Sequence, residues 1–140
     1  MTKKFKILAQ FIKDISSETP NVQSYIYVKE NISKYHLSID ISSEPLKNKM
    51  IEVSTTLKFE DKEPNEKKSY FEIIYVSIVK IDEDIKDKKD LEKIILSDVQ
   101  NDIYPNLEKA FLDLLHNSGF PEVKLEKKVD FNKLFNERSN

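Results

Sequence analysis

Apolar and polar side chains alternate through much of the first half of the chain. Between residues 35 and 42 every second side chain is apolar, namely Tyr35, Leu37, Ile39 and Ile41. The stretch from 51 to 59 repeats this period of two, which is typical of a strand with one buried and one solvated face. The pattern therefore predicts two strands, and the residues between them, which include Pro45 and Asn48, predict a turn.

The stretch from Ser69 to Ile81 is apolar on both of its faces. One face carries Phe71, Ile73, Tyr75, Val79 and Ile81, and the other carries Ile74, Val76 and Ile78. A strand with two apolar faces is covered on both sides. We expect helices of the same chain on one side and a second subunit on the other, with a long covering loop as the alternative.

The N-terminal stretch from Phe5 to Ser17 fits two periods. Every second position is apolar at Phe5, Ile7, Ala9 and Phe11, whereas Leu8, Ile12 and Ile15 follow helical spacing. The β-branched residues and the polar end of the stretch favour a strand over a helix.

After residue 81 the period changes to that of helices. Four apolar residues follow helical spacing, at Leu91, Ile94, Ile95 and Val99. They predict an amphipathic helix over 89–102, and Tyr104-Pro105 predicts a break before a second helix that ends near Gly119. Asp130 predicts the cap of a last helix. Strands followed by helices indicate an α+β protein with an antiparallel sheet.

The amino-acid composition argues against several kinds of catalytic and binding site. The 140 residues suit one domain, and 23 basic against 25 acidic residues argue against nucleic acid as a partner. Cysteine is absent, and a single glycine excludes glycine-rich phosphate loops. His36 and His116 fall on different predicted elements, so no shared metal site is expected. No signal peptide or membrane span is evident, and we expect a cytoplasmic protein without cofactor or metal.

Three ordered pieces of the sequence resemble one family. Lys13 to Ser16, followed by Glu18 and Pro20-Asn21, is similar to the "KDIS-x-E-x-PN" stretch of the SecB family of bacterial protein-export chaperones. Phe71 to Tyr75 resembles the family's "xEVxY" strand. Gly119-Phe120-Pro121, followed by Val129 to Phe135, resembles the family's C-terminal motif.

The resemblance implies a fold and an assembly. It implies a four-stranded antiparallel sheet with C-terminal helices packed on one face, in a single SecB-like domain over 1–136. The tail 137–140 is expected to be disordered. SecB-like subunits form homotetramers as a dimer of dimers, keep unfolded precursor proteins from folding, and deliver them to the translocation motor SecA. They catalyse no reaction.

The resemblance also implies which residues bind these partners. Matched positions for docking of SecA are Asp14, Glu18, Tyr70, Phe71 and Glu72. Candidates for an apolar groove that accepts many client sequences are Tyr25, Tyr27, Ile74, Val76, Ile78, Ile94, Ile95 and Val99. Without the resemblance, the acidic residues would be interpreted as solubilising side chains of a strand face, and the apolar ones as core or subunit interface.

Two other hypotheses stay open. Val76 to Val79 and Glu108 depart from the family pattern, where a small residue with glycine and an arginine are usual. These departures motivate the hypothesis of a SecB-fold chaperone or adaptor with one dedicated partner, for example a toxin–antitoxin pair. An enzyme with a small ligand in an α+β pocket is the third hypothesis, which saturable binding of a metabolite would support.

Overall fold

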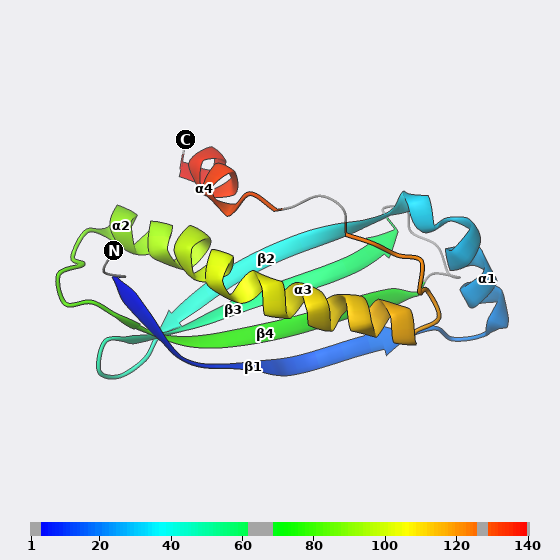
Figure 1. Cartoon of the computed structure of the whole chain (residues 1–140), viewed down its shortest axis with the longest axis horizontal. Helices are drawn as coiled ribbons and strands as arrows, with labels where there is room; N and C mark the ends of the chain where they lie inside the picture. The colour runs from blue at the N-terminus through cyan, green and yellow to red at the C-terminus, as the bar shows by residue number, and fades with distance from the viewer. Residues whose placement is uncertain (1–3, 62–68, 126–128, 140) are drawn as a thin grey trace.

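A four-stranded antiparallel sheet forms one layer of the protein (Figure 1). The computed structural model describes residues 4–61, 69–125 and 129–139. The strands are β1 (Phe5–Glu18), β2 (Tyr35–Pro45), β3 (Met50–Asp61) and β4 (Tyr70–Ile81), in the order β1-β4-β3-β2. The predicted α+β class is confirmed, and so is the strand interpretation of the N-terminal stretch.

A long helical rod crosses one face of the sheet (Figure 1). It consists of α2 (Lys88–Lys93), the π-helical segment η2 (Ile94–Asp98) and α3 (Val99–Asn117) without interruption. The predicted break at Tyr104-Pro105 is therefore wrong. A proline removes the hydrogen bond to the carbonyl four residues earlier, which belongs to Asn101. Pro105 and Asn101 both lie on the exposed side of the rod, where water can solvate that carbonyl.

A short helix and a 3-10 turn connect β1 to β2 at one end of the sheet (Figure 1). They are α1 (Val22–Glu30) and η1 (Ile32–Lys34), and no pattern in the sequence predicted them. Asn21 caps α1, since its side chain accepts a hydrogen bond of 2.8 Å from the Ser24 amide.

The last predicted helix is confirmed as α4 (Phe131–Ser139). Its cap is the predicted one, because Asp130 Oδ1 accepts a hydrogen bond of 3.0 Å from the Lys133 amide. α4 packs against η2, where Ser97 donates a hydrogen bond to Asn132. Residues 137 to 139, which the sequence assigned to a disordered tail, belong to this helix, and Asn140 lies outside the described residues.

The core lies between the helical rod and the inner face of the sheet. Its fully buried side chains include Leu57, Phe71 and Ile73 from the sheet, and Leu107 and Phe111 from α3. Burying large apolar side chains of this kind contributes about 1.5–3 kcal/mol each, so this layer contact dominates the stability of the fold.

The opposite, outer face of the sheet is covered by no element among the residues that the structure describes. The second apolar face of β4 lies here, with Val76 only 1% exposed and Ile74 and Ile78 half-buried. Val76 pairs with Phe11 of β1 and with Ser54 of β3, which flank it on both sides. Cover of this face by a second subunit stays a prediction.

Candidate functional site

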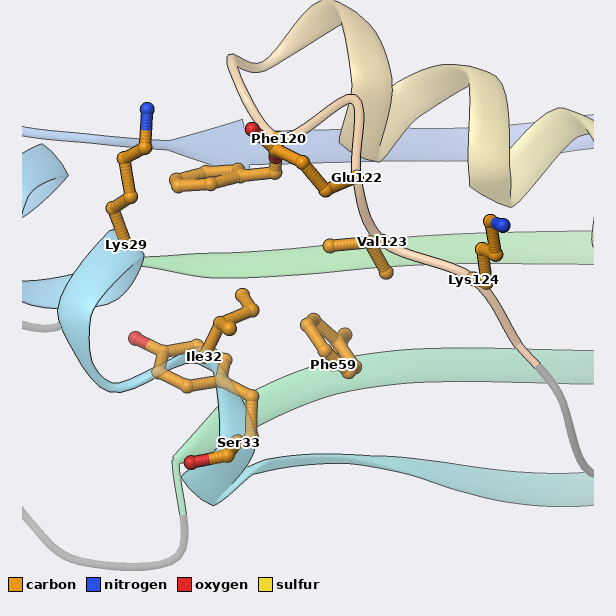
Figure 2. Close-up of a pocket in the computed structure, with 9 residues that line it drawn as sticks. Lys29, Ile32, Ser33, Phe59, Phe120, Glu122, Val123 and Lys124 are labelled. Atoms are coloured by element: carbon orange, nitrogen blue, oxygen red, sulfur yellow. The ribbon is translucent and has the colours of Figure 1, made fainter.

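A pocket lies at the end of the sheet where α1 and η1 meet the segment after α3 (Figure 2). We call it the aromatic pocket, and its volume is about 360 Å³. It is lined by Lys29, Ile32, Ser33, Tyr35, Phe59, Phe120, Glu122, Val123 and Lys124. Apolar and aromatic side chains form its floor and walls, while charged side chains stand at the rim (Figure 2). A surface of this kind accepts apolar groups of different shapes.

The aromatic side chains of this pocket are held in place by one another. The ring of Tyr35 lies 5.4 Å from Phe59, and Phe71 beneath them lies 6.5 Å from Phe59 and 5.7 Å from Phe120. Tyr35 donates a hydrogen bond of 3.0 Å to the Ser69 carbonyl. Burial raises the pKa of Tyr35 to about 12, so the phenol keeps its proton and donates at any physiological pH.

Residues 120–125, which form one wall of the pocket, have no regular secondary structure. Hydrogen bonds and ring stacking from neighbouring side chains hold this wall in place. His116 Nε2 donates a hydrogen bond of 2.9 Å to the Val123 carbonyl. Tyr25 donates one of 2.9 Å to the Gly119 carbonyl and stacks on Phe120, with ring centroids 5.2 Å apart. These contacts join α1 to the end of α3 and so fix the width of the pocket.

The eight predicted groove residues do not form one groove. Ile94, Ile95 and Val99 are buried between the helical rod and the sheet. Ile74, Val76 and Ile78 lie in a row on the outer face of the sheet. Tyr25 and Tyr27 are half-buried on α1, beside the aromatic pocket, where Tyr27 donates a hydrogen bond of 3.1 Å to Asp61.

None of the residues that line the aromatic pocket was among the groove residues predicted from the sequence. Ile32, Tyr35, Phe59, Phe120 and Val123 come from three segments that are distant in the chain, and no local pattern links them. The helix that carries Lys29 to the rim was itself not predicted. The sequence signal closest to this pocket was the Gly119-Phe120-Pro121 motif, which was used for the resemblance alone.

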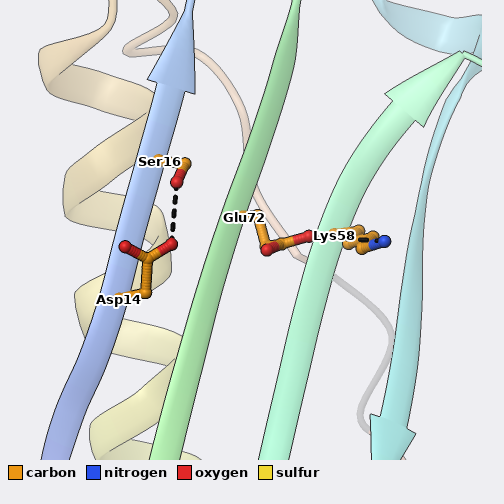
Figure 3. A network of polar contacts seen from close by, with 4 residues as sticks. All are labelled: Asp14, Ser16, Lys58 and Glu72. Carbon is orange, nitrogen blue, oxygen red and sulfur yellow. Dashed lines mark hydrogen bonds and ion pairs between the residues drawn. The ribbon is translucent and has the colours of Figure 1, made fainter.

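Four of the five predicted docking residues lie together on the outer face of the sheet. Asp14 and Glu18 of β1 pair across the strands with Ile74 and Tyr70 of β4, and Glu72 lies between these two positions on β4. Figure 3 shows Asp14 and Glu72 on this common face. Phe71 points the other way, because neighbouring residues of a strand face opposite sides, and its side chain is fully buried in the core.

Two polar contacts order this acidic surface, which we call the docking face. Ser16 donates a hydrogen bond of 2.9 Å to Asp14, and Lys58 Nζ lies 3.3 Å from Glu72 Oε2 (Figure 3). The lysine is about half exposed, so this ion pair contributes little to stability. Asp14 and Glu18 are both exposed to solvent.

The described residues hold no group of three or more side chains suited to bind a metal ion. None of the described helices is both long enough and apolar enough to span a bilayer.

The fold resembles that of a known chaperone. The Mycobacterium tuberculosis SecB-like chaperone Rv1957, solved in complex with a ChAD peptide from the HigA1 antitoxin, superposes with a TM-score of 0.64. The two chains are 11% identical, and the match covers 89% of this chain and 91% of the other. At this identity the likeness establishes the α+β fold.

Sequence comparison identifies the family. The family model described as preprotein translocase subunit SecB matches residues 1–140. A SecB-named protein of Pelagibacter ubique is 56% identical over 140 residues, with both chains covered fully. The protein-export protein SecB of Bartonella quintana is 24% identical, with 96% of this chain and 83% of that protein covered. The chain belongs to the SecB family of protein-export chaperones, which confirms the resemblance seen in the sequence.

Proposed function

We propose that the protein is a cytoplasmic holdase that binds non-native precursor segments and presents them to a SecA-type translocation ATPase. The aromatic pocket carries the first part of this proposal. Its apolar lining has no deeply placed charge, and it can therefore bind an aromatic or aliphatic anchor of a client without reading a defined sequence. The bound peptide of the Mycobacterium tuberculosis relative supports the same type of ligand.

The pocket can be tested with a tryptophan-containing peptide. The chain has no tryptophan, so the fluorescence of a single peptide tryptophan reports binding without background. We expect saturable binding that weakens about tenfold in Ile32→Ser/Val123→Ser, because both changes remove apolar contact area from the pocket. Leu46→Ser, a change of an exposed leucine in the β2–β3 hairpin, is the matched control. Equal affinity in all three proteins would contradict this pocket as the client site.

Self-association is the second part of the proposal. β1 is an edge strand of the described sheet, and it exposes four large apolar side chains: Leu8, Phe11, Ile12 and Ile15. Natural proteins rarely leave a long apolar edge strand uncovered. A second copy that covers it would start the assembly, and a dimer of dimers of 16.5 kDa chains would have a mass of about 66 kDa.

The docking face carries the third part. Its carboxylates would attract a basic segment of the SecA-type motor, and the exposed ring of Tyr70 beside them would add apolar contact. The proposal uses Asp14, Glu18, Tyr70 and Glu72, because Phe71 is in the core.

The triple variant Asp14→Asn/Glu18→Gln/Glu72→Gln should weaken SecA binding by about 1–3 kcal/mol in total, since exposed charge pairs contribute little each. Binding of the two purified proteins would be measured by calorimetry at low and high salt, and the difference from wild type should shrink as salt rises.

Asp40→Asn/Glu44→Gln/Glu52→Gln is a charge-matched control. It removes three carboxylates from the same face of the sheet, over β2 and β3. An equal loss in both triple variants would mean that the net charge alone attracts the motor. No loss in either would favour a chaperone with one dedicated partner over a role in general export.

A further inference from the structure

The exposed side of α1 carries two apolar residues that the core does not use. Val22 is 68% exposed and Ile26 is 48% exposed, whereas Ser24 and Val28 are buried on the opposite side of the helix. At 100° per residue, Val22, Ile26 and Lys29 share one face. Lys29 is also a rim residue of the aromatic pocket, so this apolar surface, which we call the α1 ridge, begins where the pocket ends.

Several contacts hold α1, and with it the ridge, in place beside the pocket. Asn21 caps the first turn of α1. Tyr25 donates a hydrogen bond to the Gly119 carbonyl and stacks on Phe120, and Tyr27 donates one to Asp61. Lys29 Nζ lies 6.0 Å from the centre of the Tyr25 ring, so the charged end of this rim residue lies over Tyr25. The apolar edge of β1 belongs to a different element, so self-association does not require the ridge.

We propose that the α1 ridge is a second anchor site for the client segment that occupies the aromatic pocket, an inference that rests on the proposed function above. The occupant is an extended stretch of non-native polypeptide with two apolar residues. The helix rises about 1.5 Å per residue, so Val22 lies about 10 Å along the axis from Lys29. An extended chain covers that distance in about three residues, and about one to three more reach from Lys29 at the rim into the pocket, which places the second anchor about four to six residues from the first.

Two peptides separate the ridge from the pocket. The short peptide carries one tryptophan among serine and glycine residues, and the long peptide adds a leucine about five residues from the tryptophan. We expect the wild-type protein to bind the long peptide about tenfold more tightly. In Val22→Ser/Ile26→Ser this advantage should disappear, while the affinity for the short peptide should stay unchanged. Both residues are exposed, so the variant should fold with little change in its melting temperature.

Leu46→Ser is again the matched control, because it removes an exposed leucine from the hairpin at the other end of the sheet and should leave both affinities unchanged (Figure 1). Equal affinity of the wild-type protein for both peptides would contradict the α1 ridge as a second anchor site, while the aromatic pocket would remain supported as a client site. An equal loss for both peptides in Val22→Ser/Ile26→Ser would also overturn it, because α1 would then only support the pocket.

Two further outcomes would contradict the proposed second anchor site. A lower mass of Val22→Ser/Ile26→Ser by light scattering would show that a second copy of the chain covers the ridge, and would overturn the proposal. If the wild-type protein binds neither peptide, the proposed holdase function fails, and the ridge fails with it.

Discussion

Gly119→Ala should lower the free energy of unfolding by about 2–4 kcal/mol, as the sum of backbone strain and a steric clash. Gly119 has φ +106°, a conformation that residues with a Cβ atom rarely adopt. A Cβ at this position would lie 2.6 Å from Cε1 of Tyr25. That ring cannot move freely, because it stacks on Phe120 and its hydroxyl donates to the Gly119 carbonyl. Urea unfolding followed by far-ultraviolet circular dichroism measures the effect.

The clash and the strain can be separated with a second variant. In a Tyr25→Ala background the clash is gone, so Gly119→Ala should cost only the strain of its backbone, about 1–2 kcal/mol. The same cost in both backgrounds would contradict the contact with Tyr25. Because Phe120 follows directly and lines the aromatic pocket, Gly119→Ala should also weaken the binding of the tryptophan peptide to the folded protein.

The alternation of apolar residues was a sufficient signal for β2 and β3, whereas β1 was predicted from its β-branched residues and β4 from its two apolar faces. Leu37 and Ile39 of β2 follow a period of two, and each strand of the sheet begins within about one or two residues of its predicted position. The helical rod was harder to predict, since Pro105 normally ends a helix. The residues next to Pro105 in the sequence do not show that this proline lies on the solvent-exposed side of a continuous helix whose other side is buried.

The helix α1 escaped prediction for a related reason. Its buried side includes the polar residue Ser24, and its exposed side carries the apolar residues Val22 and Ile26. Because Val28 is buried as well, apolar residues lie on both sides of α1, and periodicity gives only a weak signal for this helix. The exposed apolar side chains also make the ridge a functional candidate, because side chains that the fold does not bury are available to a partner.

The two candidate sites differ in how far the sequence could define them. Asp14 and Glu72 belong to strands, and within a regular stretch of strand the parity of the positions fixes which side chains share a face, although the register shift between Ile12 and Asp14 reverses this parity within β1. The same parity excludes Phe71, which the resemblance had placed with them. The aromatic pocket depends on how Phe59, Phe120 and Val123 meet in three dimensions, which a single sequence does not determine.

The buried polar contact between the two layers gives the second large expected effect. Gln100 of α3 is fully buried. Its Oε1 accepts a hydrogen bond of 2.9 Å from the Thr55 hydroxyl of β3, and its Nε2 donates one of 3.2 Å to the Ile95 carbonyl in the π-helical segment η2. Gln100 therefore links the sheet to the point where the helical rod changes its hydrogen-bond pattern.

Gln100→Leu should lower the free energy of unfolding by about 2–4 kcal/mol, because a buried hydroxyl without a partner costs about 1–3 kcal/mol and the Ile95 carbonyl loses a donor as well. Thr55→Val/Gln100→Leu should be more stable than Gln100→Leu, since replacing both partners by apolar groups leaves no hydroxyl unpaired. Urea unfolding of the four proteins in this cycle gives the coupling between the two residues. Strictly additive losses would contradict the hydrogen bond. A positive coupling would mean that this polar pair stabilises the contact between the helical rod and the sheet.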